Sequence, residues 1–277
     1  MRKTLETLQP PTDAEERAHP CGKVYLVGAG PGDPELITVK GLRCLRAADV
    51  VLYDRLISTD LLDEAPSGAE LVYVGKGPGC HTMSQTEINT SMIAYARSGR
   101  TVVRLKGGDP YVFGRGGEEA LALAQAGIPF EVVPGVSAAI AVPARAGIPV
   151  THRDHASTVT IVTGHPGHGH AAPAVNWEAL AHLGGTLVVL MGVKALPDFT
   201  RHLIESGLAT DLPAAVIQEG TLPRQRTITG TLADIAERAL AAGLSSPATT
   251  VIGRVVSLEQ MLGCGEMVLE QGYLFEE

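Results

Sequence analysis

The stretch Arg104-Leu-Lys-Gly-Gly-Asp-Pro-Tyr-Val-Phe-Gly-Arg-Gly-Gly-Glu118 joins an apolar, strand-like run (Thr101 to Leu105) to a helix-like run (Glu118 to Ala126). Glycines at the end of a strand let a ligand approach the backbone closely, because they carry no Cβ. The same stretch holds two arginines, a lysine and an aspartate, which are charges that a purely structural loop does not need. The pattern therefore predicts an α/β unit with a small-molecule site at a strand end.

The composition indicates a folded protein with an acidic balance. The 277 residues are 45% hydrophobic and carry a formal net charge of −8. A chain of this length suggests about two domains and can bury a sizeable core. The negative charge argues against nucleic acid as a general partner, although an acidic small molecule can still bind where basic residues gather.

The sequence also predicts a cytoplasmic protein with no membrane-spanning segment, because no apolar run approaches the roughly 18 residues that a bilayer requires. Residues 1–20 are polar, lack the apolar centre of a signal peptide, and are expected to form a disordered leader. The four cysteines lie far apart and form no CxxC, so neither a zinc site nor a disulfide framework is expected.

Short apolar runs alternate with helix-like segments in two series. This pattern predicts two α/β domains, the first with a mostly parallel sheet, and leaves strand order and direction open. The first series has strands at Val24–Val27, Val50–Tyr53, Leu71–Val74, Thr101–Leu105 and Phe130–Val133, and helices such as Leu36–Ala47 and Gln85–Ser98. The second has strands at Thr158–Val162, Thr186–Leu190, Ala214–Gln218 and Thr249–Val256, and helices at Leu196–Ser206 and Leu232–Ala242. The expected domains are residues 21–135 and 156–265, with a Pro/Gly-spaced connector over 136–155 and a tail over 266–277.

Glycines or polar residues follow the predicted strands. Since the carboxyl ends of parallel strands share one edge, where ligands bind, these segments predict a cleft between the two domains. They are Gly28 to Pro34, Asp54, Gly75-Lys76-Gly77, Gly107 to Pro110 and Pro134 to Ala138 in the first series, and Thr163-Gly164-His165, Met191-Gly192 and Gln218-Glu219-Gly220 in the second.

The first glycine cluster departs from a dinucleotide-binding fingerprint. Asp33 stands where the third glycine is needed, and Pro31 and Pro34 remove backbone N–H donors that a pyrophosphate would use. An NAD-dependent oxidoreductase is therefore only a distant alternative.

Taken together, several motifs resemble those of the uroporphyrinogen-III C-methyltransferases within the tetrapyrrole methylase family, over about residues 22–260. The matching segments are Val27 to Pro34, Val51 to Leu56, Val74 to Lys76, Gln85-x-Glu-Ile-Asn89, Val103 to Pro110, Phe113 to Glu119, Val133 to Ala138, Gly147 to Arg153, Thr163 to His165, Leu190 to Gly192, Gln218 to Gly220 and Arg226 to Gly230.

The resemblance implies S-adenosylmethionine-dependent methylation of uroporphyrinogen III at C2 and C7, giving precorrin-2, by a homodimer that folds the cofactor into the cleft between its two α/β domains. A methylase of a later precorrin is the nearer alternative. The resemblance assigns acid/base roles to Asp54 and Lys76, and places Arg115 and Glu118 where they hold or deprotonate the substrate. Its cofactor positions map onto Pro31, Gly107, Gly108, Asp109, Val112, Ser137, Ala138, Met191 and Gly220.

The chemistry of this reaction suits such residue types. A pyrrole carbon is already electron-rich, so the protein needs no nucleophile, but it does need a base to accept a proton. The substrate is a polycarboxylate, which arginines bind bidentately while they stay charged. Arg55, Lys106 and Arg153 are therefore expected to bind substrate, and Arg104, Arg115 and Arg145 are further candidates.

Two local features stay open. His165, His168 and His170 superficially resemble a metal cluster, but a solvated glycine loop is the preferred interpretation and no metal is expected. The family usually has a basic residue after Gly75-Lys76, whereas here Gly77-Pro78-Gly79 precedes His81, which leaves one substrate contact open.

Overall fold

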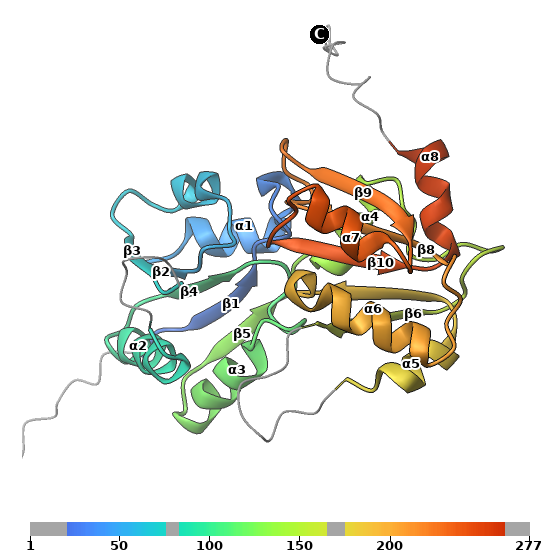
Figure 1. The fold of residues 1–277 in the computed structure, drawn as a ribbon. Coiled ribbons are helices and arrows are strands. Elements are labelled where there is room, and N and C mark those ends of the chain that lie inside the picture. The colour runs from blue at the N-terminus through green and yellow to red at the C-terminus, as the bar shows by residue number, and fades with distance from the viewer. Residues whose placement is uncertain (1–20, 76–82, 165–174, 264–277) are drawn as a thin grey trace, which may run out of the picture.

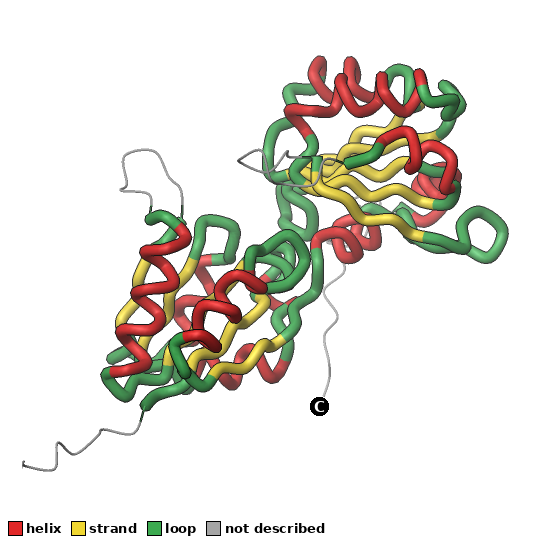
Figure 2. The backbone as a smooth tube through the Cα atoms, turned by 90° about the horizontal axis from the view of Figure 1, so that it is seen from below, coloured by secondary structure: helices red, strands yellow, loops and turns green. Residues whose placement is uncertain are grey.

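The computed structural model describes residues 21–75, 83–164 and 175–263, which form two five-stranded sheets with helices on both faces of each (Figure 1). The expected leader 1–20 and tail 266–277 lie outside the described residues. Seen from below, the two groups of strands form separate units (Figure 2). The predicted architecture of two α/β units is confirmed. In the part of the chain that the structure describes, no helix is long and apolar enough to cross a membrane.

The first sheet is entirely parallel, with the strand order β3-β2-β4-β1-β5. All five strands lie within one residue of their predicted bounds, because buried parallel strands are continuous apolar runs. The strands are β1 (Val24–Gly28), β2 (Val50–Tyr53), β3 (Glu70–Tyr73), β4 (Val102–Lys106) and β5 (Phe130–Val133).

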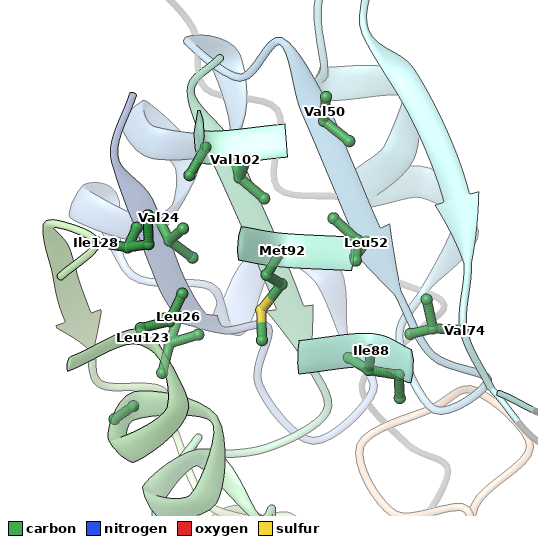
Figure 3. Close-up of a cluster of buried hydrophobic side chains, with 12 residues drawn as sticks. Val24, Leu26, Val50, Leu52, Val74, Ile88, Met92, Val102, Leu123 and Ile128 are labelled. Atoms are coloured by element: carbon green, nitrogen blue, oxygen red, sulfur yellow. The ribbon is translucent and has the colours of Figure 1, made fainter. Parts of the chain in front are cut away.

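Helices cover both faces of this sheet. The helix α1 (Val39–Arg46) and the 3-10 helix η2 (Thr59–Glu64) pack on one face. On the other face lie α2 (Gln85–Arg97) and α3 (Gly116–Gln125), whose Met92 and Leu123 face strand residues such as Leu26 and Leu52 (Figure 3). Alternate residues of β4 therefore point toward α2 and α3.

Caps set where two of these helices begin. The predicted helix from Leu36 starts instead with a separate 3-10 turn, η1 (Pro34–Leu36), and α1 begins only at Val39, because the Thr38 hydroxyl accepts a hydrogen bond from the Gly41 N–H. Ser84 and Glu87 form a capping box that starts α2.

The second sheet is mixed, with the order β6-β7-β10-β8-β9. β6 and β7 are parallel, whereas β10 is antiparallel to both of its neighbours, so β6, β7 and β8 all end at the same edge. β9, which the sequence analysis did not identify, pairs antiparallel with β8. The strands are β6 (Val159–Thr163), β7 (Thr186–Leu190), β8 (Pro213–Gln218), β9 (Arg226–Thr231) and β10 (Ala248–Ile252).

The helices of the second unit also lie on two faces. One face carries α5 (Trp177–Leu183), α6 (Leu196–Glu205) and α7 (Ile235–Ala241), and the short η3 (Val193–Ala195) precedes α6. The other face carries α4 (Ala138–Arg145) and η4 (Arg254–Leu258), followed by α8 (Glu259–Leu262).

Two segments differ from the sequence-based expectation. The expected connector contains the helix α4, whose Val142 is buried against Ile217 of β8 and Val251 of β10. The last predicted strand, Thr249–Val256, stops at Ile252, and Val255 and Val256 instead lie in the 3-10 helix η4.

Candidate active site

The first sheet changes its winding direction between two neighbouring strands. β1 leads to α1 on one face, whereas β4, which pairs with β1, leads to α3 on the opposite face. The loops that leave the carboxyl ends of two such strands diverge, and ligands of open parallel sheets bind in the crevice this creates. This point of the fold carries Gly28 to Pro34 and Gly107 to Pro110.

The loops after β1, β4 and β5 approach one another closely through their backbones. A Cβ at Gly28 would lie 2.5 Å from the Cα of Gly135 and 2.7 Å from the carbonyl oxygen of Gly108. Gly30 and Gly108 exchange backbone hydrogen bonds of 3.3 and 2.6 Å. Side chains at Gly28 and Gly135 would hold the loops apart, which explains why glycines stand at these two positions.

Asp109 ties two of these loops together. One carboxylate oxygen accepts a hydrogen bond from the Tyr111 N–H at 2.8 Å, and the other accepts one from the Gly135 N–H at 3.0 Å. The Val112 N–H donates to the Asp109 carbonyl at 3.4 Å. Asp109 thus shapes the loop, and each carboxylate oxygen keeps a further lone pair for a ligand.

The start of α4 lies beside Gly108. Ser137 caps this helix, since its hydroxyl accepts a hydrogen bond from the Ala139 N–H at 3.3 Å. A Cβ on Gly108 would meet only the Ala138 nitrogen, at 3.9 Å. This face of Gly108 is therefore open enough for a ligand to approach the backbone.

The second sheet brings the end of β8 to the same region, and β7 ends at the same edge of that sheet. Gly220, after β8, lies against α4, since a Cβ there would be 2.3 Å from Cγ1 of Val142. The next residue, Thr221, accepts a hydrogen bond from the Asp33 N–H, two positions after Pro31. Met191 follows β7 and is 50% exposed. The expected cofactor segments thus come from both units.

The residues here fit S-adenosylmethionine in chemical type. Gly107, Gly108 and Ala138 offer backbone groups with room around Gly108, Asp109 offers a carboxylate, and Met191 offers exposed apolar surface. A nucleoside with an amino-acid tail needs this mixture of backbone hydrogen bonds and apolar surface.

Asp54 lies at the neighbouring strand end, after β2, with its side chain 25% exposed. One carboxylate oxygen accepts a hydrogen bond from the Leu56 N–H at 3.0 Å, and the other lies 3.5 Å from a guanidinium nitrogen of Arg104. Asp54, Arg55, Leu56 and Gly75 line a hollow of about 230 Å³. The carboxylate is therefore held in place and faces open space. Lys76 lies outside the described residues.

Arg115 and Glu118 form an exposed ion pair at the start of α3. Two parallel hydrogen bonds join them, from Nε to Oε1 at 2.9 Å and from Nη2 to Oε2 at 2.6 Å. The hydrogen bond from Arg115 lowers the pKa of Glu118, and the same bond raises the pKa of Arg115. Both groups are charged near neutral pH, and Glu118 restricts where the guanidinium can point.

Three further charges form a buried cluster beneath Asp54. The Glu119 carboxylate is fully buried and accepts hydrogen bonds from Arg104 Nε at 3.1 Å, Lys106 Nζ at 3.1 Å and Gln85 Nε2 at 3.2 Å. Burial is the main cause that lowers the pKa of Lys106, followed by the charge of Arg104, while Glu119 opposes both. Since Arg104 also contacts Asp54, the cluster connects the floor of the hollow to α2 and α3.

The structure places the expected substrate-binding residues very differently. Lys106 is 3% exposed and forms a buried ion pair with Glu119, whereas Arg55 is exposed and lines the hollow. Arg153 is exposed in the turn closed by the His152–Ala156 bridge, and no ion pair of the described chain joins it to the strand-end loops. Arg145 lies at the end of α4 that is remote from Ser137.

Sequence reasoning missed Glu119 and Thr221 as members of this region. Arg104 and Lys106 alternate along a strand that is otherwise buried, and two such cations require a nearby anion, so this signal could have identified Glu119. Thr221 gives no comparable signal, because its partner is a backbone N–H 188 positions away in the chain.

Unusual backbone conformations gather in the same loops. In the described residues, non-glycine residues with positive φ occur only in the loop between β4 and α3 and in the loops after β7 and β8. Such conformations are costly, and they concentrate at functional sites. They are Phe113, Arg115, Met191, Glu219 and Thr221.

No group of three or more His, Cys, Asp or Glu side chains within residues 21–75, 83–164 and 175–263 has an arrangement that could hold a metal ion. His165, His168 and His170 lie outside these ranges, as do Gly77, Pro78 and Gly79.

Comparison with known proteins agrees with this geometry. A S-adenosyl-L-methionine-dependent uroporphyrinogen III methyltransferase of Methanosarcina barkeri is 54% identical over 242 residues, which cover 87% of this chain and 95% of that protein. A siroheme synthase of Thiobacillus denitrificans is 48% identical over 258 residues, covering 93% of this chain and 53% of that protein, so the chain spans about half of its length.

A solved structure gives the same result. A uroporphyrin-III C-methyl transferase from Thermus thermophilus, complexed with S-adenyl homocysteine, is 41% identical and superposes with a TM-score of 0.74, covering 86% of this chain and 100% of that one. The family model for tetrapyrrole (corrin/porphyrin) methylases matches residues 23–236. The chain therefore belongs to the tetrapyrrole methylase family.

Proposed function

We propose that the protein transfers methyl groups from S-adenosylmethionine to C2 and C7 of uroporphyrinogen III, giving precorrin-2. The observation that carries this proposal is that glycine-lined loops from both sheets meet, and that one of these loops, at Gly107, lies against Leu56 of the hollow that Asp54 borders. The 54% identity to a relative named for this activity supports the choice of substrate. The similar siroheme synthase supports siroheme as one destination of the product.

The methyl transfer needs no covalent bond between the protein and the substrate. When bound, S-adenosylmethionine supplies a methyl group on a positively charged sulfur, which keeps the electron pair of the broken bond. The residues of the chain have to hold the electron-rich pyrrole carbon in line with that methyl group and accept a proton from the methylated tetrapyrrole. The cofactor contacts are proposed at Pro31, Gly107, Gly108, Asp109, Val112, Ser137, Ala138, Met191 and Gly220.

Asp54 is the proposed proton acceptor. Its carboxylate accepts a hydrogen bond from the Leu56 N–H, lies 3.5 Å from a guanidinium nitrogen of Arg104, and borders the hollow. Lys76 is proposed to share the acid/base work on the strength of the family motif alone. Glu118 is less suited to accept a proton, because its pKa is lowered by Arg115.

Arg55 and Arg115 are the proposed first contacts for the substrate carboxylates, since both are exposed beside the strand ends. Lys106 could reach a carboxylate only after its ion pair with Glu119 opened. Arg153 is proposed to bind substrate because of its motif.

Replacing Arg115 with glutamine is expected to raise KM for uroporphyrinogen III about tenfold or more, since a hydrogen bond to a charged group contributes about 1.5–3 kcal/mol. Steady-state kinetics on purified variants measures the effect. Arg100→Gln is the matched control. Arg100 forms a similarly exposed ion pair with Glu70, but this pair lies where β3 and β4 begin, at the edge of the sheet opposite the strand-end loops. Equal KM values for the two variants would contradict the role of Arg115.

The activity is tested by incubating the protein with uroporphyrinogen III and methyl-labelled S-adenosylmethionine, and by following the tetrapyrrole by mass spectrometry. We expect a product that has gained two methyl groups. Absence of methylated product overturns the proposal, and methylation of a later precorrin alone supports the alternative methylase. Binding of NAD with no binding of S-adenosylhomocysteine in calorimetry supports the oxidoreductase.

The resemblance also supports a homodimer in the cytoplasm, which we propose. Size-exclusion chromatography with light scattering should then give a mass of twice the 28.9 kDa chain. A mass of 28.9 kDa at working concentration would contradict the dimer.

A further inference from the structure

One hydrogen bond crosses from the first unit to the second at the candidate cofactor site. The Asp33 N–H, in the loop after β1, donates to the hydroxyl of Thr221, in the loop after β8, at 3.1 Å. Thr221 is only 7% exposed, so water does not readily replace it. The loops touch closely, since a Cβ at Gly32 would lie 3.1 Å from Cγ of Leu222.

Thr221 adopts a backbone conformation that its side chain disfavours. Its φ is +71°, and a β-branched residue at positive φ is a genuine outlier. Two hydrogen bonds hold the turn: the Thr221 N–H donates to the Gln225 side-chain oxygen at 2.8 Å, and the Leu222 N–H donates to the Glu219 carbonyl at 3.2 Å. Glycine would relieve the backbone but lacks a hydroxyl, so the conformation is compatible with a role for that hydroxyl.

The two ends of this hydrogen bond adjoin expected cofactor contacts. Pro31 lies two positions before Asp33, and Gly220 lies immediately before Thr221. Gly220 in turn packs on Val142 of α4, the helix that begins at Ala138. A shift of the loop after β1 would therefore change the distance between Pro31 and the second unit's contacts.

We propose that Thr221 is a positioning residue for the cofactor: its hydroxyl fixes the loop after β1 against the second unit and so sets the width of the cofactor site. This inference rests on the proposed function, because it assumes that S-adenosylmethionine binds between these loops. Ordinary packing between the two units is the competing explanation. It would depend on the volume of the side chain, which valine preserves, rather than on the hydroxyl, which serine preserves.

The test compares Thr221→Val with Thr221→Ser in titration calorimetry with S-adenosylhomocysteine. Loss of one buried hydrogen bond is worth about 1–1.5 kcal/mol, so valine should weaken Kd about five- to tenfold, whereas serine should stay within about twofold of wild type. When the S-adenosylmethionine concentration is varied, KM for S-adenosylmethionine should rise in Thr221→Val. The rate at saturating S-adenosylmethionine, kcat, should remain near the wild-type value. Thr227→Val, a half-buried threonine of β9, is the matched control and should change neither value.

The outcomes separate this inference from the function on which it rests. Wild-type protein that does not bind S-adenosylhomocysteine contradicts the proposed function itself. If the wild-type protein and Thr221→Val bind S-adenosylhomocysteine with equal Kd, the positioning role is overturned. It is also overturned if Thr221→Ser binds S-adenosylhomocysteine as weakly as Thr221→Val. If circular dichroism shows that the valine variant is unfolded, Thr221→Ala takes its place with the same expected loss of affinity relative to serine.

Discussion

Replacing Glu119 with alanine is expected to lower the free energy of unfolding by about 3–5 kcal/mol, because the change leaves Lys106 buried without its anion and Arg104 with only its 3.5 Å contact to Asp54. The carboxylate has no exposed surface and receives hydrogen bonds from both cations and from Gln85. Burial of an uncompensated charge is among the few single changes that can destabilise a domain so strongly. Urea denaturation followed by circular dichroism measures the loss.

The neighbouring residue supplies a matched control for this prediction. Glu118 shares the same motif and helix turn, but its ion pair with Arg115 is exposed, and such pairs contribute about 0–1 kcal/mol. Glu118→Ala should therefore unfold at almost the wild-type urea concentration. Similar losses in the two variants would show that the buried cluster contributes no more than a surface pair.

Replacing Asp54 with asparagine is expected to lower kcat about 10²- to 10⁴-fold, the usual contribution of a positioned general base. Asparagine keeps the size of the side chain and an oxygen that can accept the hydrogen bond from the Leu56 N–H. It removes the charge and the ability to take up a proton. Rapid-quench measurement of a single turnover with labelled S-adenosylmethionine isolates the chemical step.

The affinity of Asp54→Asn for the cofactor shows whether the substitution removes only the base or also disturbs the cofactor site. Kd for S-adenosylhomocysteine should stay within about twofold of wild type in Asp54→Asn, because the expected cofactor loops do not use this carboxylate. Asp60→Asn, on η2, tests whether any loss of a carboxylate in this segment has the same result. A kcat within threefold of wild type in Asp54→Asn would contradict its role as proton acceptor.

The first sheet could be predicted closely from the sequence, whereas in the second sheet the strand β9, the end of β10 and the strand directions could not. The strands β1 to β5 are short apolar runs bounded by glycines and polar residues, and a parallel sheet buried on both faces needs such runs. β9 reads Arg-Thr-Ile-Thr-Gly-Thr and lies at the sheet edge, where few apolar residues are required. The antiparallel placement of β10 depends on partners distant in sequence, which a local pattern does not encode.

Helix α4 illustrates a second limit. Pro134, Gly135, Pro143 and Gly147 surround or interrupt it and indicate a connector, yet its Val142 and Ala146 are buried against the second sheet. Tertiary packing overrides local propensity here. The candidate site shows the same division: glycine loops at strand ends are visible in the sequence, but the hydrogen bonds from Asp33 to Thr221 and from Gln85 to Glu119 join residues far apart in the chain.

The backbone contact among the strand-end loops determines how the region can be mutated. At Gly28 and Gly135 even a methyl group would overlap main-chain atoms of a neighbouring loop, at 2.5 and 2.3 Å. Alanine scanning at these two positions therefore reports on whether the loops can close, and says nothing of what they bind. A variant library meant to change ligand preference should keep both glycines and diversify Leu56, Tyr111 and Phe113, whose exposed side chains can change without moving the junction.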